Sequence, residues 1–171
     1  MADIVLFTAS TLDGFIAGPK GELDWLFHDC DYGYADFYES IGSMIMGYKT
    51  FEVVKSFDGP YPHSDRKNYV FTRSEREAFE DVKYIRTDPI EFTEELKRKE
   101  MKDIWLVGGG IINSMLLHAE LIDKMVLSIH PLTIGHGIPL FSNYPCKKCE
   151  FKLESAKTFD SGMLQVTYVK K

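Results

Sequence analysis

The feature that most constrains how this chain folds is an apolar segment that runs directly into three consecutive glycines. Residues 104–107 are all apolar, which is typical of a strand covered on both faces of a parallel sheet. Gly108, Gly109 and Gly110 follow, and residues 111–118 have the pattern of a helix. Glycines in this place leave backbone N–H groups open at a helix N-terminus, where the helix dipole attracts anions. The segment therefore predicts a phosphate cradle, with a purely structural tight turn as the alternative.

Strands and helices alternate along most of the chain, and strands alone follow residue 123. A loop with a short helical turn near residues 24–27 is expected over residues 15–31. Helices are expected at residues 33–42, 47–57, 89–99 and 111–118. Strands are expected at residues 3–9, 43–46, 68–72, 82–85, 104–107, 124–130, 150–159 and 163–169.

This order of elements predicts an α/β fold. Alternating strands and helices imply a mixed, mostly parallel central sheet with helices on its faces, and the last two strands read as a C-terminal antiparallel hairpin. The chain has 171 residues, of which 44% are hydrophobic, enough for one well-covered core and short for two. We therefore expect a single domain over residues 1–171.

Charge and composition narrow the class of partner. The formal net charge of −6 disfavours non-specific binding to nucleic acid or to an anionic membrane surface. The N-terminal residues lack the basic region of a signal peptide, and their apolar run is too short to span a bilayer. Three cysteines, an odd number, argue for a reducing compartment. We expect a cytoplasmic protein whose partner is a small molecule.

Cys146 and Cys149 have the spacing of half a zinc site. A tetrahedral site needs two further ligands, and no second paired spacing occurs in the chain. A zinc-dependent deaminase also needs an H-x-E motif beside P-C-x-x-C, and only the second motif is present, at residues 145–149. We therefore expect no bound metal and read the segment as a polar turn.

Two further polar loops follow predicted strands. The first contains Gly47, Lys49 and Thr50 at a helix start, and the second contains Thr72, Arg73 and Ser74. In open α/β sheets, ligands bind at the carboxyl ends of the strands, so these loops and the glycine triplet are expected at one edge. Three such loops favour one extended ligand over three unrelated turns.

Four segments in this order resemble the dihydrofolate reductase-like superfamily, in the branch of the reductase domain of bacterial riboflavin biosynthesis. They are residues 10–17, 46–52, 107–110 and 131–141. The resemblance implies an NADPH-dependent oxidoreductase, and a homodimer. Its substrate would be a small heterocycle: a pterin, a pyrimidine or a riboflavin precursor such as 5-amino-6-(5-phosphoribosylamino)uracil. A non-catalytic nucleotide-binding protein of the same fold is the alternative.

The resemblance also assigns cofactor residues. It places the pyrophosphate and nearby ribose at Val107, Gly108, Gly109, Gly110, Ile111 and Ile112, and the nicotinamide at Ala9, Ile16 and Ala17. The adenosine-phosphate side would comprise Gly47, Tyr48, Lys49, Thr50, Thr72, Arg73 and Ser74. Lys49 and Arg73 are the expected partners of the 2′-phosphate. The sequence departs from the family at Tyr48, where many dihydrofolate reductases carry arginine. A bulky β-branched residue at Gly110 is expected to abolish binding and leave the fold intact.

The substrate side is less clearly marked. Asp36, or failing that Asp31, is expected to hold a ring N–H or to relay a proton, since a carboxylate near apolar surface can acquire a suitable pKa. Solvated helix charges are the alternative reading. Trp25 and Tyr34 are candidates for stacking on a flat substrate, and each could equally belong to the core. No clear counterpart of the arginine that binds the folate glutamate tail is found, which argues against folate itself.

Overall fold

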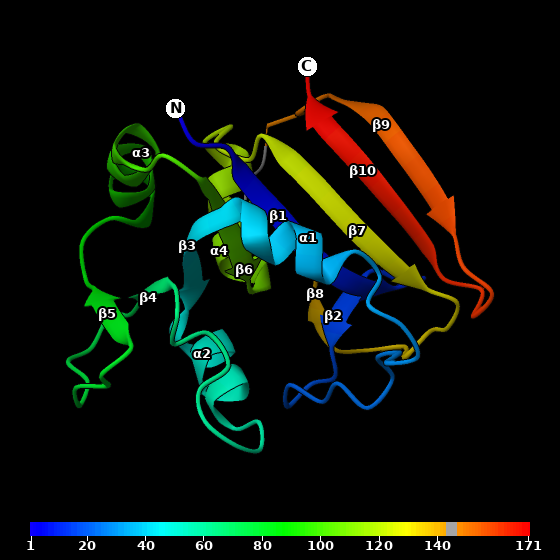
Figure 1. Cartoon of the computed structure of the whole chain (residues 1–171), viewed down its shortest axis with the longest axis horizontal. Coiled ribbons are helices and arrows are strands. Elements are labelled where there is room, and N and C mark those ends of the chain that lie inside the picture. Colours follow the sequence, from blue (N-terminus) through cyan, green and yellow to red (C-terminus); the bar gives the residue numbers. More distant parts are fainter. Residues whose placement is uncertain (143–146) are drawn as a thin grey trace.

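A computed structural model describes residues 1–142 and 147–171, and its main feature is an eight-stranded sheet (Figure 1). The strand order is β5-β4-β3-β6-β1-β7-β10-β9. Six strands are parallel: β1 (Ile4–Thr11), β3 (Ile41–Gly47), β4 (Lys67–Phe71), β5 (Val82–Ile85), β6 (Asp103–Gly108) and β7 (Lys124–His130). The last two strands, β9 (Phe151–Thr158) and β10 (Leu164–Lys170), form an antiparallel hairpin against β7. The expected α/β class, mixed sheet and C-terminal hairpin are confirmed.

Helices cover both faces of the sheet. Helices α3 (Pro89–Lys99) and α4 (Gly110–His118) pack on one face, where Leu6 and Leu106 are fully buried. Helices α1 (Tyr34–Ser40) and α2 (Tyr48–Lys55) lie on the other face, around Trp105 and Phe51. Figure 1 shows α1 crossing in front of β1, with α4 behind the sheet. Residues 104–107 of β6 are all apolar and separate these two cores, as a strand covered on both faces must.

A second, two-stranded sheet lies at the carboxyl edge of the main sheet. It pairs β2 (Phe15–Ala17) with β8 (Ile138–Pro139), and the Leu140 N–H donates to Gly14 O at 2.9 Å. The Asp13 carboxylate accepts from the Gly135 N–H at 2.8 Å and ties the two segments together. The expected loop over residues 15–31 therefore begins as a strand. Near residues 24–27 there is one hydrogen-bonded turn and no helix.

Cys146 lies outside the described residues, and the Cys149 thiol donates to Leu117 O at 3.4 Å. Within residues 1–142 and 147–171, no three His, Cys, Asp or Glu side chains are grouped so that they could hold a metal ion. In the same part of the chain, every helix is too short or too polar to cross a membrane.

Candidate cofactor and substrate site

The parallel strands end at one edge of the sheet, and this edge collects the residues singled out in the sequence. Because the strand order runs β4-β3-β6-β1, the ends of these strands place Thr72, Gly47, Gly108 and Ala9 in line. Neighbouring strands are about 4.8 Å apart, so the line spans about 15 Å. Helix α2 and the small β2–β8 sheet lie along this edge, on the lower side of Figure 1. The edge is long enough for an extended, dinucleotide-sized ligand.

The glycine loop contacts two segments that are distant in sequence. A Cβ built at Gly109 would lie 3.1 Å from Thr50 Oγ1 in α2 and 3.8 Å from Ile16 Cδ1 in β2. A Cβ at Gly47 would lie 3.3 Å from Ile112 Cγ1 in α4. The structure therefore brings together members of the pyrophosphate, adenosine-phosphate and nicotinamide groups expected from the sequence. A side chain at either glycine would enter the narrow space between these segments.

The starts of α2 and α4 leave backbone N–H groups without a side-chain cap. Helix α3 begins differently, because the Asp88 carboxylate accepts from the N–H groups of Ile90 and Glu91. In α2 and α4 the N-cap residues are Gly47 and Gly109, which have no side chain to offer. Open N–H groups and two helix dipoles therefore meet at the glycine loop, an arrangement that favours an anion such as pyrophosphate.

Gly110 serves packing. A Cβ at Gly110 would overlap the backbone oxygen of Pro139 and lie 2.6 Å from Ser142 Oγ. The Ser142 N–H also donates to Gly110 O at 3.1 Å, and Asn113 Nδ2 donates to Leu140 O at 2.9 Å. The expectation that a bulky residue at Gly110 leaves the fold intact is therefore wrong, since it would push the segment of residues 138–142 off the glycine loop.

The expected adenosine-phosphate group is partly exposed, and Arg76 contacts two of its members. Lys49, Arg73 and Ser74 are exposed, and Thr72 is half-buried at the end of β4. The Arg76 guanidinium lies 3.6 Å from the centre of the Tyr48 ring, and its Nε–H donates to Thr72 Oγ1 at 3.3 Å. Sequence reasoning missed Arg76. The available signal was the tyrosine at the position where many dihydrofolate reductases carry arginine.

Ala9 lies on the face of the sheet covered by α1. It follows Phe7 by two residues and so faces the same side of β1, where the Phe7 ring stacks on Phe37 of α1 at 4.2 Å. Its register partner in β7 is Ser128. Gln165 Nε2 donates both to Ser128 Oγ at 3.1 Å and to Tyr32 O at 2.9 Å. These two hydrogen bonds hold the segment before α1 close to Ala9.

Trp25 and Tyr34 occupy two different aromatic clusters. The Trp25 ring lies edge-on to His130 at 5.1 Å, and its buried Nε1–H has no hydrogen-bond partner among the described residues. The Tyr34 ring contacts Trp105 at 5.9 Å and Phe7 at 6.3 Å. Tyr34 is partly open to solvent, whereas Trp25 is half-buried and belongs to the loop that leads to α1. Both clusters flank the region of Ala9.

His130, at the end of β7, was not singled out from the sequence. Its Nδ1 lies 3.1 Å from Ser128 O, and its Nε2 accepts from the Phe27 N–H at 3.2 Å. These partners fix the neutral tautomer with the proton on Nδ1, because Nε2 must be an acceptor. Burial lowers the pKa of His130 below its usual value, which also favours the neutral ring.

The two candidate carboxylates differ in their surroundings. The Asp31 carboxylate accepts from the Ala35 N–H at 3.1 Å and thus caps the first turn of α1. Asp31 is also adjacent to Tyr32, whose carbonyl is bonded to Gln165. Both carboxylates are exposed, and the helical period of α1 puts Asp36 on the side away from Tyr34, which packs towards the sheet. Asp31 is therefore nearer to the chain of contacts that reaches Ala9.

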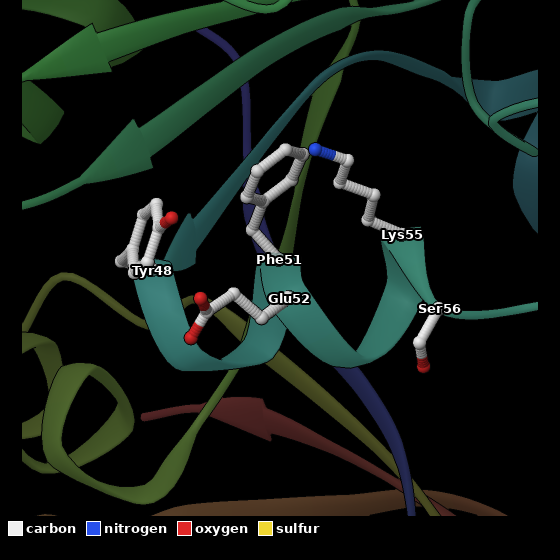
Figure 2. Close-up of a pocket in the computed structure, with 5 residues that line it drawn as sticks. All are labelled: Tyr48, Phe51, Glu52, Lys55 and Ser56. Atoms are coloured by element: carbon white, nitrogen blue, oxygen red, sulfur yellow. The ribbon is translucent and has the colours of Figure 1, made fainter. Parts of the chain in front are cut away.

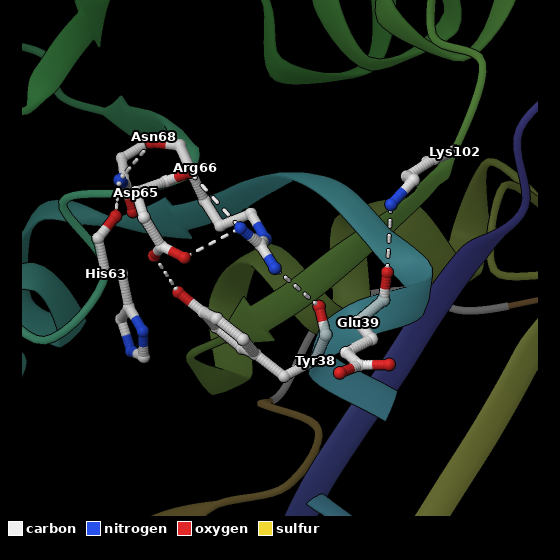
Figure 3. Close-up of polar contacts among 7 residues, drawn as sticks. All are labelled: Tyr38, Glu39, His63, Asp65, Arg66, Asn68 and Lys102. Carbon is white, nitrogen blue, oxygen red and sulfur yellow. Dashed lines mark hydrogen bonds and ion pairs between the residues drawn. The ribbon is translucent and has the colours of Figure 1, made fainter. Parts of the chain in front are cut away.

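A polar network joins α1 to the loop before β4 (Figure 3). The Tyr38 hydroxyl donates to Asp65 at 2.5 Å, and Arg66 pairs with the same carboxylate at 2.7 Å. Arg66 also donates to Tyr38 O at 3.2 Å. Burial and the bond to Asp65 raise the pKa of Tyr38, while the same bond lowers the pKa of Asp65. Arg66 is thus neutralised within the fold and fixes the position of α1.

A cavity of about 310 Å³ lies beside α2 and is separate from the glycine loop. Figure 2 shows Tyr48, Phe51 and Lys55 along one side of the helix, with Glu52 and Ser56 completing the lining. Of these residues only Tyr48 belongs to the expected cofactor group. The cavity therefore borders the adenosine-phosphate end of the site and does not contain the cradle.

Comparisons with known proteins agree with this geometry. The family model of the RibD C-terminal domain matches residues 61–165, more than half of the chain. The uncharacterized protein YyaP of Bacillus subtilis (strain 168) is 34% identical over 176 residues, which cover 96% of this chain and 93% of YyaP.

Solved structures show the same fold. A protein of Shewanella sp. PV-4, named as a candidate riboflavin biosynthesis protein, is 29% identical, with a TM-score of 0.87 over 100% of this chain and 99% of that chain. Dihydrofolate reductase from Enterococcus faecalis, complexed with NADP(H) and RAB-propyl, is 19% identical. Its TM-score is 0.72 over 99% of this chain and 96% of that chain, which shows similarity of fold alone.

Proposed function

This chain belongs to the RibD C-terminal domain family, and on that premise we propose that it is an NADPH-dependent reductase of a small heterocycle. One observation carries the proposal: two segments that are distant in sequence converge on Gly109, and a side chain there would fill the space between Thr50 and Ile16. A cradle of this kind, at two uncapped helix starts, suits the pyrophosphate of a dinucleotide.

We assign the residues at the carboxyl edge of the sheet to the parts of NADPH in the order in which the strands lie. Val107, Ile111 and Ile112 together with the glycine triplet would hold the pyrophosphate and ribose, and Ala9, Ile16 and Ala17 would flank the nicotinamide. Gly47, Tyr48, Lys49, Thr50, Thr72, Arg73 and Ser74 would line the adenosine end, where Lys49 and Arg73 supply positive charge. When bound, NADPH supplies the hydride. The proposal includes a cytoplasmic location and a homodimer.

The substrate would lie on the α1 face of the sheet, against Ala9. Tyr34 and Trp25, in the two aromatic clusters that flank this region, offer surfaces for a flat ring. A pterin, a pyrimidine or a riboflavin precursor such as 5-amino-6-(5-phosphoribosylamino)uracil has the required shape. For the proton we propose Asp31 ahead of Asp36, because Asp31 adjoins the contacts from Tyr32 through Gln165 to Ser128. Asp31 would hold a ring N–H or relay a proton as the hydride arrives.

The proposal is tested by titrating the protein with NADPH and NADH while following nicotinamide fluorescence, and then by following NADPH oxidation with a panel of pterins, pyrimidines and riboflavin precursors. We expect binding of NADPH and turnover of one member of the panel. The Asp31→Asn variant retains the helix cap and loses the proton, so NADPH affinity should survive while kcat falls by roughly 10²–10⁴. Asp36→Asn is the matched control.

Each result has a definite meaning. Failure to bind either nicotinamide cofactor at millimolar concentration would show the proposal to be wrong. Tight NADPH binding with no turnover across the panel would favour the non-catalytic nucleotide-binding protein. A larger loss of kcat in Asp36→Asn than in Asp31→Asn would reverse the order of the two carboxylates.

A further inference from the structure

Arg76 is held in place by two residues of the adenosine-phosphate group. Its guanidinium carbon lies 3.6 Å from the centre of the Tyr48 ring, close enough for a cation–π contact. Its Nε–H donates to Thr72 Oγ1 at 3.3 Å. The Thr72 hydroxyl also accepts from the Ser74 N–H at 3.2 Å, so one side chain organises the whole turn after β4. A flexible surface arginine is thereby given a defined position.

The positive charge of Arg76 has no ion-pair partner among the described residues. Among the ion pairs of the described residues, Arg66 pairs with Asp65 at 2.7 Å and Arg86 pairs with Glu75 at 3.5 Å, while Arg76 is paired with no carboxylate. Arginine has five N–H donors, and the contact with Thr72 uses only the one on Nε. The donors on the two terminal nitrogens remain available, and they match the bidentate geometry of a phosphate group.

Arg76 lies at the end of the sheet's carboxyl edge where the adenosine of the proposed cofactor would bind. Tyr48 is the first residue of α2 and follows Gly47, which adjoins Ile112 of α4. Thr72 follows β4, the strand next to β3 and farther from the glycine loop. A dinucleotide whose pyrophosphate lies at Gly109 therefore brings its adenosine ribose towards Tyr48 and Thr72.

We propose that Arg76 is the residue that selects NADPH over NADH, and that Tyr48 is its positioning residue. The proposal rests on the function proposed above and adds the cation that reads the 2′-phosphate. Many dihydrofolate reductases carry arginine at the Tyr48 position, whereas this chain has an aromatic ring there, and Arg76 from the loop after β4 lies on that ring. Lys49, Arg73 and Arg76 are all exposed, but only Arg76 has a ring contact among these three within residues 1–142 and 147–171. Ordering Lys49 or Arg73 would cost more rotamer entropy than ordering Arg76, which is already held.

The test compares dissociation constants for NADPH, NADH, 2′,5′-ADP and 5′-ADP in the wild-type protein and in four variants. Arg76→Gln should weaken NADPH and 2′,5′-ADP roughly 10- to 100-fold, the loss expected for one charge-assisted contact, and leave NADH and 5′-ADP unchanged. Tyr48→Leu should shift the same two ligands in the same direction by a smaller factor, whereas Tyr48→Phe keeps the ring under Arg76 and should shift them less than Tyr48→Leu does. Arg86→Gln, which removes an exposed arginine already paired with Glu75, is the matched control.

The outcomes separate this inference from the proposed function. If Arg76→Gln binds NADPH as tightly as the wild type, or loses NADPH and NADH equally, the role of Arg76 is refuted and the reductase proposal stands. Equal affinities of the wild type for NADPH and NADH lead to the same conclusion. A wild type that binds neither cofactor overturns both. Parallel behaviour of Tyr48→Leu and Tyr48→Phe refutes the positioning role of the ring.

Discussion

Gly109 and Gly110 are neighbours in the chain, yet a side chain would meet different surroundings at each. At Gly109 a methyl group would enter the space between Thr50 and Ile16, and at Gly110 it would strike the backbone of Pro139. We therefore expect Gly109→Ala to weaken NADPH binding at least about 10-fold while changing the free energy of unfolding by less than about 1 kcal/mol. Fluorescence titration and urea denaturation measure the two quantities.

Gly110→Ala is the contrasting variant. Overpacking against a backbone oxygen that cannot move independently should lower the free energy of unfolding by about 1–3 kcal/mol. If the two alanine variants are equally stable and bind NADPH equally, the division between a ligand-facing and a packing glycine is disproved.

His63 and His130 predict how stability depends on pH. Both rings are buried, and burial lowers the pKa of each below 6.5, the value expected in the unfolded chain. As the pH falls, these two histidines therefore take up protons in the unfolded chain before they do so in the folded one. Their contribution to stability is fully present above about pH 6.5 and is lost progressively below it. The slope can reach at most about 1.4 kcal/mol per pH unit for each histidine.

Urea denaturation between pH 7.5 and pH 5.5 should show this loss, in a window chosen above the titration of most carboxylates. His63→Gln should reduce the slope, because Gln cannot take up the proton. His136→Gln changes an exposed residue that does not act on either buried histidine, and is the control that should keep the wild-type slope. An unchanged slope in His63→Gln would contradict the prediction.

At the scale of elements, helices with strong local signals are the most predictable. Helix α3 has the expected bounds because Asp88, Pro89 and the basic residues of its last turn all act within the helix itself. The glycine loop and the strand before it were likewise predictable from the sequence, since an apolar run and three glycines are local features.

The missed features are those defined by partners far away in the sequence. Strands β2 and β8 have three and two residues, too few for any period, and exist because Phe15 pairs with Pro139. Arg76 acquires its place from Tyr48, and His130 acquires its partners from Phe27 and Ser128. Composition and spacing do not encode such contacts, so the glycine loop was predictable and the surroundings of Arg76 and His130 were not.

The whole molecule ends in an exposed edge strand. Seven of the eight residues of β9 are exposed, including Leu153, and β9 is the last strand of the sheet. An unpaired edge invites association with another chain, which supports the proposed homodimer. Light scattering on a size-exclusion column at micromolar concentration should give twice the mass of the chain. A monomer mass would disprove the dimer, and a dimer that persists in Leu153→Lys would place the interface elsewhere.

The position of β1 has a consequence for how the protein is made. Although it is the first strand of the chain, its neighbours in the sheet are β6 and β7, with Ile4 beside Ile104 and Leu6 beside Met125. While the ribosome adds about a hundred residues, roughly 5–20 s at ordinary rates of synthesis, an apolar strand of the central sheet has no partner. The nascent chain must therefore be kept from aggregating until its second half emerges, and the strand made first is among the last to be paired.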